Sequence, residues 1–381
     1  MNRILGLDIV RSIAILLVVS VHSTYVFSAE AKEFLQSWIP NIDGVSVFFV
    51  LSGYLIGGIL FRTIDKTGLT IRDLGQFWIR RWFRTLPNYF LVLVILLAYG
   101  VVIYKKESQF SYRYLVFIQN LISPHPDFFP EAWCLSVEEW FYLLFPFLCY
   151  LGLKLHLNRR KVILAVTFAF LIVPFVLRLF AYATDYELAY WGNNYRNIVI
   201  FRVDSLMYGI LGAYLQRYKT AVWIRMKYPG IILSVLLIMC LTAYAAFKGN
   251  LKFWPVCYEN LESIAALSAL PYFSRLGNIR SQRLAAVFTF ISTISYSMYV
   301  LNLSIIQWRV IPAFLSITHL REMAAGHLGI LSFALFWPFT LGSAYLLYRY
   351  FERPMMDLRD KINSHAEPDT VTNKKNVREG T

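Results

Sequence analysis

Ten long apolar segments are the feature that most constrains how this chain can fold. Each is long enough to cross the hydrocarbon core of a bilayer, which takes about 20 residues in a helix. In lipid a backbone must satisfy its own hydrogen bonds, and 57% of the 381 residues are hydrophobic. The sequence therefore predicts an all-α, polytopic integral membrane protein with about ten transmembrane helices, and it excludes an ordinary soluble domain. The segments cover approximately residues 4–27, 44–62, 82–104, 136–153, 161–181, 195–216, 228–247, 257–273, 285–308 and 328–350.

The distribution of charge predicts how these helices are oriented. Lys and Arg gather in the second, fourth, sixth and eighth loops, whereas the first loop, 28–43, has one lysine and three acidic residues. Because cytoplasmic loops of membrane proteins carry the excess of basic residues, we expect both termini in the cytoplasm. The same placement in short loops indicates that the net charge of +14 is a topology signal and that no nucleic acid is bound.

Residues 1–356 are predicted to form one transmembrane domain. Residues 357–381 are polar and lack periodicity, so we expect a disordered cytoplasmic tail. We expect no cleavable signal peptide, because the first apolar segment is long, lacks a small-residue cleavage site and carries Arg11. The four cysteines have no metal-ligand spacing, and no metal site is predicted.

Arg11 and His22 lie inside the first apolar segment. Residues eleven apart are almost three helical turns apart, so both side chains share one face, about 16 Å apart along the axis. Ionisable groups at membrane depth are costly and are usually kept for function. We interpret the pair as a polar track through the bilayer; the alternative is two buried residues that only hydrogen-bond neighbouring helices. Asp8, three residues before Arg11, is a candidate local partner.

Two adjacent carboxylates, Glu138 and Glu139, stand at the start of segment 136–153. The predicted topology places them near the outer face, at the depth of His22. A carboxylate beside an imidazole fixes its tautomer and supports it as a general base. We expect one of the two to pair with His22; the alternative is a pair of solvated acids favoured by the helix dipole.

An arginine cluster, Arg80, Arg81 and Arg84, lies at the predicted cytoplasmic end of segment 82–104. Arg81 and Arg84 are three apart and share a helix face. The planar guanidinium group binds phosphate through two parallel hydrogen bonds. The cluster indicates a site for a phosphorylated ligand; the alternative is a positive-inside anchor that contacts lipid headgroups.

Arg202 and Asp204, in segment 195–216, are two positions apart and do not face each other along a helix. We expect each to have a partner on another helix, in a structural or a functional role. With Arg11 and His22 they support a second hypothesis, a transporter or flippase that uses intramembrane charges as a relay. A third hypothesis is a membrane scaffold without catalytic activity.

The remaining features are interpreted as structural. Small residues in 44–54 are expected to let helices pack closely. His125, His319 and His327 fall in predicted outer loops without partner spacing, so we expect solvated side chains.

Seven motifs occur in one order along residues 4–356, and as a set they resemble the membrane-bound acyltransferase family 3, which includes the O-antigen and Nod-factor acetylases. Each motif is weak alone, whereas the ordered set is specific. Asn302 departs from the pattern, because many members have a histidine there. The motifs are Arg11 with His22, 48–56, Arg81 with Arg84 and Pro87, 135–142, 202–204, 294–299 and 351–354.

This resemblance implies a multi-pass enzyme of the bacterial inner membrane, with 1–356 as its acyltransferase domain. Such enzymes move an acyl group, usually acetyl, from cytoplasmic acyl-coenzyme A to a sugar or lipid-linked glycan. Carried over by position, His22 is the catalytic histidine and Glu138 or Glu139 its partner, while Arg11, Arg81 and Arg84 bind the donor. No cofactor is implied beyond acyl-coenzyme A, expected to be acetyl-coenzyme A, as co-substrate. The family's appended soluble hydrolase-like domain is absent, so we expect a further step outside the membrane to use another protein.

The residues and the resemblance predict the same reaction. Coenzyme A carries phosphates, which Arg80, Arg81 and Arg84 would capture at the inner face while its thin arm passes Arg11. His22 would then remove the proton from an acceptor hydroxyl, which attacks the thioester. An acyl-histidine intermediate is the alternative that the sequence leaves open.

Overall fold

The computed structural model describes residues 3–104, 110–184, 195–246, 254–323 and 327–365. Regular structure in these ranges is helical, which confirms the all-α class. In chain order the elements are α1 (Leu5–Ser23), η1 (Thr24–Val26), α2 (Ala29–Ser37), α3 (Gly44–Thr67), α4 (Ile71–Tyr104), η2 (Tyr112–Val116), α5 (Ala132–Lys154), α6 (Arg159–Ala183), η3 (Tyr195–Asn197), α8 (Val199–Arg202), α9 (Asp204–Tyr218), α10 (Thr220–Arg225), α11 (Lys227–Ala246), α12 (Trp254–Phe273), α13 (Gln282–Leu301), η4 (Asn302–Val310), α14 (Ile311–Ile317), α15 (Leu320–Met323), α16 (Leu328–Leu347), η5 (Tyr348–Glu352) and α17 (Arg353–His365).

Eight helices within the described residues are long and apolar enough to cross a membrane. Large apolar side chains on α6 and α11, such as Ile172 and Ile232, are exposed, as expected of helices that face lipid. The protein is therefore a polytopic membrane protein. The eight spans are Leu5–Val26, Gly44–Thr67, Ile71–Val102, Ala132–Lys154, Arg159–Ala183, Lys227–Ala245, Gln282–Ile317 and Leu328–Arg359.

Two of the ten predicted spans are not among these eight. Segment 195–216 is divided among η3, α8 and α9, and α9 has only 15 residues. Segment 257–273 lies in α12, where the buried carboxylates of Glu259 and Glu262 interrupt the apolar surface. In both segments the structure places charged residues inside the protein. Eight of the ten predicted spans thus have a matching long apolar helix among the described residues, and the total of ten stays a prediction.

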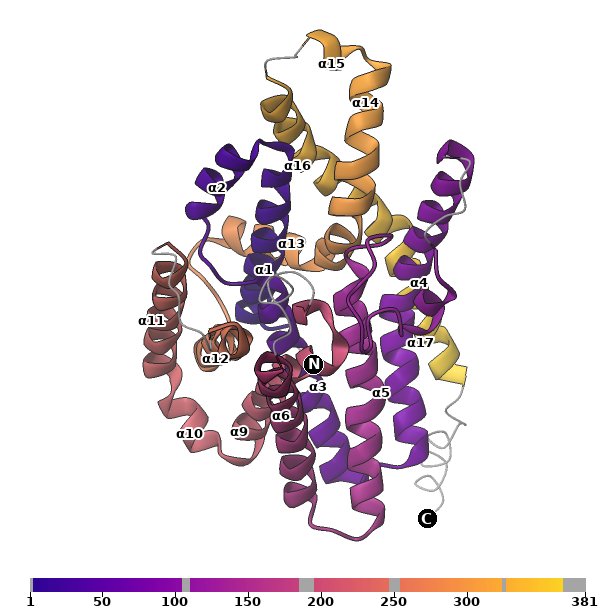
Figure 1. Cartoon of the computed structure of the whole chain (residues 1–381). Helices are drawn as coiled ribbons and strands as arrows, with labels where there is room; N and C mark the ends of the chain where they lie inside the picture. The colour runs from indigo at the N-terminus through magenta and orange to yellow at the C-terminus, as the bar shows by residue number, and fades with distance from the viewer. Residues whose placement is uncertain (1–2, 105–109, 185–194, 247–253, 324–326, 366–381) are drawn as a thin grey trace.

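The first helix, α1, lies inside the bundle and packs against α3, α12 and α13 (Figure 1). Close approach between α3 and α9 depends on glycine, as expected for 44–54. A Cβ atom on Gly53 would lie 1.9 Å from the carbonyl oxygen of Leu206, and one on Gly209 would lie 2.0 Å from that of Val50. These contacts fix α3 between α1 and α9, and so position the side chains that α3 contributes to the site.

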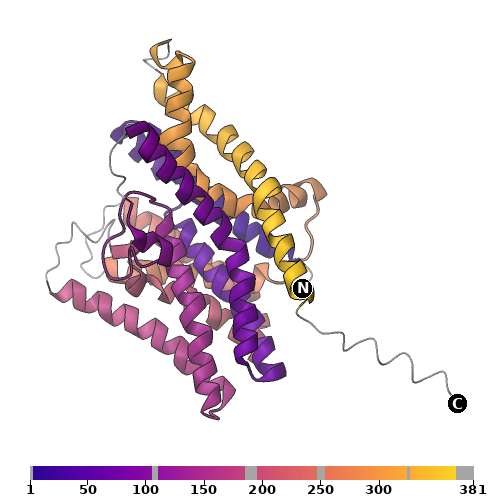
Figure 2. The ribbon, with the colours of Figure 1, turned by 90° about the vertical axis from the view of Figure 1, so that its right-hand side faces the viewer.

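The C-terminal helix α17 packs against α4, and the two run close together in Figure 2. Because α17 continues to His365, the predicted start of the tail at residue 357 lies inside a helix. The rest of the predicted tail, 366–381, lies outside the described residues.

The helical span that begins with α13 is interrupted by η4, a π-helical stretch. Such π segments are frequent at functional sites.

Candidate active site

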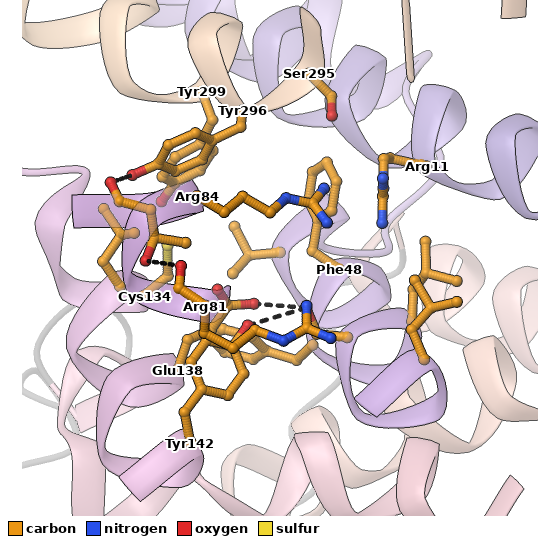
Figure 3. Close-up of a pocket in the computed structure, with 17 residues that line it drawn as sticks. Arg11, Phe48, Arg81, Arg84, Cys134, Glu138, Tyr142, Ser295, Tyr296 and Tyr299 are labelled. Carbon is orange, nitrogen blue, oxygen red and sulfur yellow. Dashed lines mark hydrogen bonds between the residues drawn. The ribbon is translucent and has the colours of Figure 1, made fainter. Parts of the chain in front are cut away.

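Three arginines point into one small cavity, which we call the arginine cavity (Figure 3). Arg11 comes from α1, whereas Arg81 and Arg84 come from successive turns of α4. Its volume is about 90 Å³. Glu138 on α5 is the one acidic residue among the described residues that line it. The structure therefore brings together the three arginines that the resemblance assigns to donor binding.

The guanidinium groups of Arg11, Arg81 and Arg84 form no hydrogen bond or salt bridge with other residues in the described part of the chain. Arg81 lies over two aromatic rings, 5.8 Å from the centroid of Phe77 and 5.9 Å from that of Tyr142. A half-buried cation needs an opposite charge or good hydrogen bonds to offset its desolvation. Three such groups around one space suit a multiply charged anion.

Two further cavities, of about 230 and 380 Å³, adjoin the arginine cavity. Arg84 lines all three spaces. Arg80 and Arg359 line the smaller neighbour, and Arg3 lines the larger. The predicted arginine cluster thus extends into a wider basic region in which Arg84 is central.

A larger space, the histidine cavity, contains His22 and has a volume of about 430 Å³. Its lining mixes aromatic and polar side chains, including Tyr25, Trp133 and Asp127. The two cavities lie along the same helix, because Arg11 and His22 are both on α1.

The hydrogen bonds around His22 define its tautomer. The amide nitrogen of Asn302 donates to the carbonyl oxygens of Met298, at 3.0 Å, and Tyr299, at 2.7 Å. The amide oxygen of Asn302 therefore faces Nδ1 of His22, 2.5 Å away, and an amide oxygen can only accept. Nδ1 of His22 must carry the proton, and Nε2 of the neutral ring keeps its lone pair. That is the arrangement a general base requires.

Comparison with known proteins identifies the family. A family model described as an acyltransferase domain matches residues 4–349. The chain belongs to this acyltransferase family. The resemblance drawn from the motifs is confirmed, and the match favours an acyltransferase over the transporter and scaffold hypotheses.

Several relatives of this acyltransferase carry assigned names. A "Putative O-acetyltransferase" of Staphylococcus aureus is 28% identical over 233 residues, which cover 56% of this chain and 35% of that protein. The peptidoglycan O-acetyltransferase OatA of Listeria monocytogenes is 25% identical over 326 residues, 79% of this chain and 49% of OatA. The chain thus spans about a third to a half of the length of these relatives. No solved structure gives a significant match.

The predicted pairing of His22 with Glu138 or Glu139 is not found. Glu138 lines the arginine cavity, where its carboxylate accepts a hydrogen bond from Ser52 at 2.8 Å. Both carboxylate oxygens of Glu139 accept hydrogen bonds from α4, from Thr85 at 2.9 Å and from Trp82 at 3.0 Å. Adjacent helical residues point about 100° apart, which separates the two roles. In this acyltransferase Asn302, not a glutamate, orients the histidine.

Glu131 is a residue of the site that the sequence analysis missed. It lines the histidine cavity, and one carboxylate oxygen accepts from the backbone N–H groups of Leu303, at 3.2 Å, and Ser304, at 2.7 Å. Those groups follow Asn302 in η4, so Glu131 holds the turn that presents Asn302 to His22. Burial raises the pKa of Glu131 to about 7. The available signal was a third carboxylate seven residues before Glu138.

The other predicted polar residues have structural partners. Asp8 pairs with Arg3 at 2.5 Å and accepts from Ser292 at 2.8 Å, so Arg3, and not Arg11, is its ion-pair partner. Arg202 and Asp204 each have partners on other helices, as expected. Arg202 donates to Ser46 at 2.6 Å and lies 3.9 Å from Glu262, while Asp204 pairs with Arg178 at 2.6 Å.

His125 is not the solvated loop histidine that the sequence suggested. It lines the histidine cavity, and its Nε2 lies 2.9 Å from the carbonyl oxygen of Phe129. Burial lowers the pKa of His125 to about 4. Arg196 and Asp43, which line the same cavity, form an ion pair. His125, Arg196 and Asp43 are therefore fixed polar groups in the wall of the histidine cavity.

Proposed function

We propose that this acyltransferase moves an acetyl group from cytoplasmic acyl-coenzyme A to a hydroxyl group of a cell-envelope glycan. The observation that carries the proposal is a pair of adjoining cavities on α1. One holds three guanidinium groups that form no salt bridge within the described residues, and the other holds a histidine with a defined basic nitrogen. The names of the relatives support acetyl as the acyl group and peptidoglycan as the class of acceptor.

The donor is held by its phosphates. Acyl-coenzyme A is a small-molecule co-substrate that carries several phosphate charges on one end and a thin thioester-bearing arm on the other. Arg80, Arg81 and Arg84 would bind the phosphates through charge-assisted hydrogen bonds, each worth roughly 1.5–3 kcal/mol. The arm then extends past Arg11 toward the histidine cavity.

The chemical step uses the lone pair of His22. Nε2 removes the proton from the acceptor hydroxyl, whose oxygen attacks the thioester carbonyl. The new carbon–oxygen bond forms, the carbon–sulfur bond breaks, and the imidazolium returns its proton to the leaving thiolate. Asn302 holds the ring throughout through the Nδ1 proton. A general base of this kind contributes about 10²- to 10⁴-fold, and positioning of the two substrates supplies the rest.

The acceptor side suits a carbohydrate. The histidine cavity is larger than the arginine cavity, about 430 against 90 Å³. Tyr25, Trp133 and Tyr258 offer aromatic faces, while Asn41 and Asp127 offer hydrogen-bonding groups. Ligand sites of this type combine apolar faces with a few placed polar groups that fix orientation.

The orientation follows from the charge of the loops. With both termini in the cytoplasm, the arginine cavity faces the inside and His22 lies toward the outside of a bacterial inner membrane. The donor and the glycan would then approach from opposite faces of the bilayer.

Mass spectrometry of envelope glycans, from cells with and without this protein, tests the proposal. We expect an acetyl mass to be lost with the protein and regained with the wild-type gene. Restoration by the exposed-site control His327→Ala, but not by His22→Ala, would assign the activity to the histidine cavity. Unchanged glycans in every strain would contradict the proposal.

A further inference from the structure

The arginine and histidine cavities share part of their lining. Among the described residues, two line both spaces: Val45, in the first turn of α3, and Tyr299, near the end of α13. We call these two side chains the neck. Both are buried, each with 6% of its surface exposed.

The neck is held in place on both sides. The hydroxyl group of Tyr299 donates to the carbonyl oxygen of Glu131 at 3.1 Å. The backbone N–H of Val45 donates to the carboxylate of Asp43 at 3.0 Å, which caps α3. Next to it, a Cβ atom on Gly44 would lie 2.2 Å from the carbonyl oxygen of Ala14, so α3 begins directly against α1. Packed and anchored side chains of this kind resist widening.

From this geometry we infer that Val45 and Tyr299 limit the length of the acyl group that the enzyme transfers. The inference rests on the proposed function, in which a donor held at the arginine cavity delivers its thioester to His22. The acyl group must pass the neck before the carbonyl carbon can reach the attacking hydroxyl. An acetyl group adds one methyl beyond that carbon, whereas longer groups must fit further methylene groups between the two side chains.

The expected discrimination between acyl donors of different length can be given a rough size. One methylene group too many in a fitted apolar site changes specificity by about 10- to 200-fold. The wild type should therefore use acetyl-coenzyme A best, with kcat/KM falling at least about 10-fold for propionyl and again for butyryl donors. Shortening either neck side chain should reduce this preference for short acyl groups. The affinity of the arginine cavity for the coenzyme A phosphates should not change.

The test compares radiolabelled acetyl-, propionyl- and butyryl-coenzyme A in membrane vesicles that contain the full chain and its endogenous glycans. We expect Val45→Ala and Tyr299→Leu each to raise the propionyl-to-acetyl ratio of kcat/KM about 10-fold or more. Val47→Ala is the matched control, because Val47 is a buried valine of the same helix that lines neither cavity. Its ratio should stay at the wild-type value.

The outcomes separate the neck from the proposed function. If either neck variant still transfers acetyl and both keep the wild-type ratio, the neck does not set acyl length. Equal use of the three donors by the wild type would overturn the inference in the same way. If the wild type transfers no acetyl group from acetyl-coenzyme A, the proposed function fails, and the neck inference fails with it.

Discussion

The two cavities beside α1 differ in the kind of chemistry that their side chains can support. The arginine cavity has three guanidinium groups and one carboxylate, and its cations form no salt bridge in the described part of the chain. In the histidine cavity Arg196 pairs with Asp43, and Glu131 is held by the backbone of η4. Unpaired charge indicates a place for a charged ligand, whereas a hydrogen-bonded histidine indicates a place for proton transfer. A single helix, α1, supplies Arg11 to the arginine cavity and His22 to the histidine cavity.

The largest expected effect comes from removing the basic nitrogen of His22. We expect His22→Ala to lower acetyl transfer by about 10²- to 10⁴-fold, because the general base is lost. Affinity for coenzyme A should stay near that of the wild type, since the arginines are intact. Transfer assays and titration of coenzyme A into the solubilised protein measure the two effects. Retention of more than a few per cent of turnover would exclude the general-base role.

The reciprocal change should affect the donor alone. Arg84→Ala is expected to weaken coenzyme A binding about 10- to 100-fold, because each charge-assisted hydrogen bond to phosphate is worth roughly 1.5–3 kcal/mol. Arg81→Ala should have a smaller effect, since Arg84 lines three cavities and Arg81 two. Arg283→Ala, at an exposed position, is the control. Unchanged affinity in Arg84→Ala and Arg81→Ala would make these residues topology anchors.

The orienting role of Asn302 predicts an effect on turnover with little effect on donor binding. We expect Asn302→Ala to lower kcat about 10-fold, the equivalent of one good hydrogen bond, with the KM for acetyl-coenzyme A unchanged. Asn302→Asp keeps an acceptor for the Nδ1 proton and should retain more activity than Asn302→Ala. Equal activity in both variants and the wild type would remove Asn302 from the mechanism.

The two neighbouring glutamates should behave differently. Glu139→Gln places an amide N–H where Trp82 or Thr85 now donates, so we expect a loss of about 1–2 kcal/mol in stability. Glu138→Gln should instead change coenzyme A affinity, because Glu138 faces the arginines. Thermal unfolding in detergent and coenzyme A titration distinguish the two effects. Identical behaviour of the variants would contradict their assignment to separate places.

The smallest effect concerns acid stability. Because burial lowers the pKa of His125 from 6.5 to about 4, the folded protein favours the neutral ring. This contribution to stability is complete above about pH 6.5 and is lost as the pH falls toward 4. We expect the unfolding temperature to fall by a few degrees across that window, and to fall less in His125→Gln. If the unfolding temperature of the wild type and of His125→Gln depends on pH in the same way, the acid sensitivity comes from other groups.

The sequence predicted the features that depend on one segment. Eight spans, the shared helix of Arg11 and His22, and the tight packing of α3 all follow from local pattern. The contacts of buried acidic groups could not be predicted in this way, because Glu262 accepts a hydrogen bond from Ser46, which lies 216 residues away in the sequence. Apolar periodicity does not show which charges a bundle will pair inside.

The site shows the same division. The grouping of Arg81 with Arg84 was predicted from their spacing, because residues three apart on a helix share a face. The partner of His22 was predicted wrongly, because Asn302 lies 280 residues away and a neutral amide gives no charge signal. Depth alone favoured Glu138 and Glu139, but depth does not fix which way a helix is turned. Glu131, just outside the apolar run, is the glutamate that lines the histidine cavity, where the sequence analysis had placed Glu138 and Glu139.

Sealed, inverted membrane vesicles test whether donor binding and acyl transfer occupy opposite ends of one helix. Labelled acetyl-coenzyme A is added outside, where the cytoplasmic face is exposed, and glycans are recovered before and after the vesicles are opened. We predict that the label is found on glycans enclosed in the vesicles, and that it is missing with His22→Ala. Label found only on acceptors at the outer surface of the sealed vesicles would contradict transfer from one face of the membrane to the other.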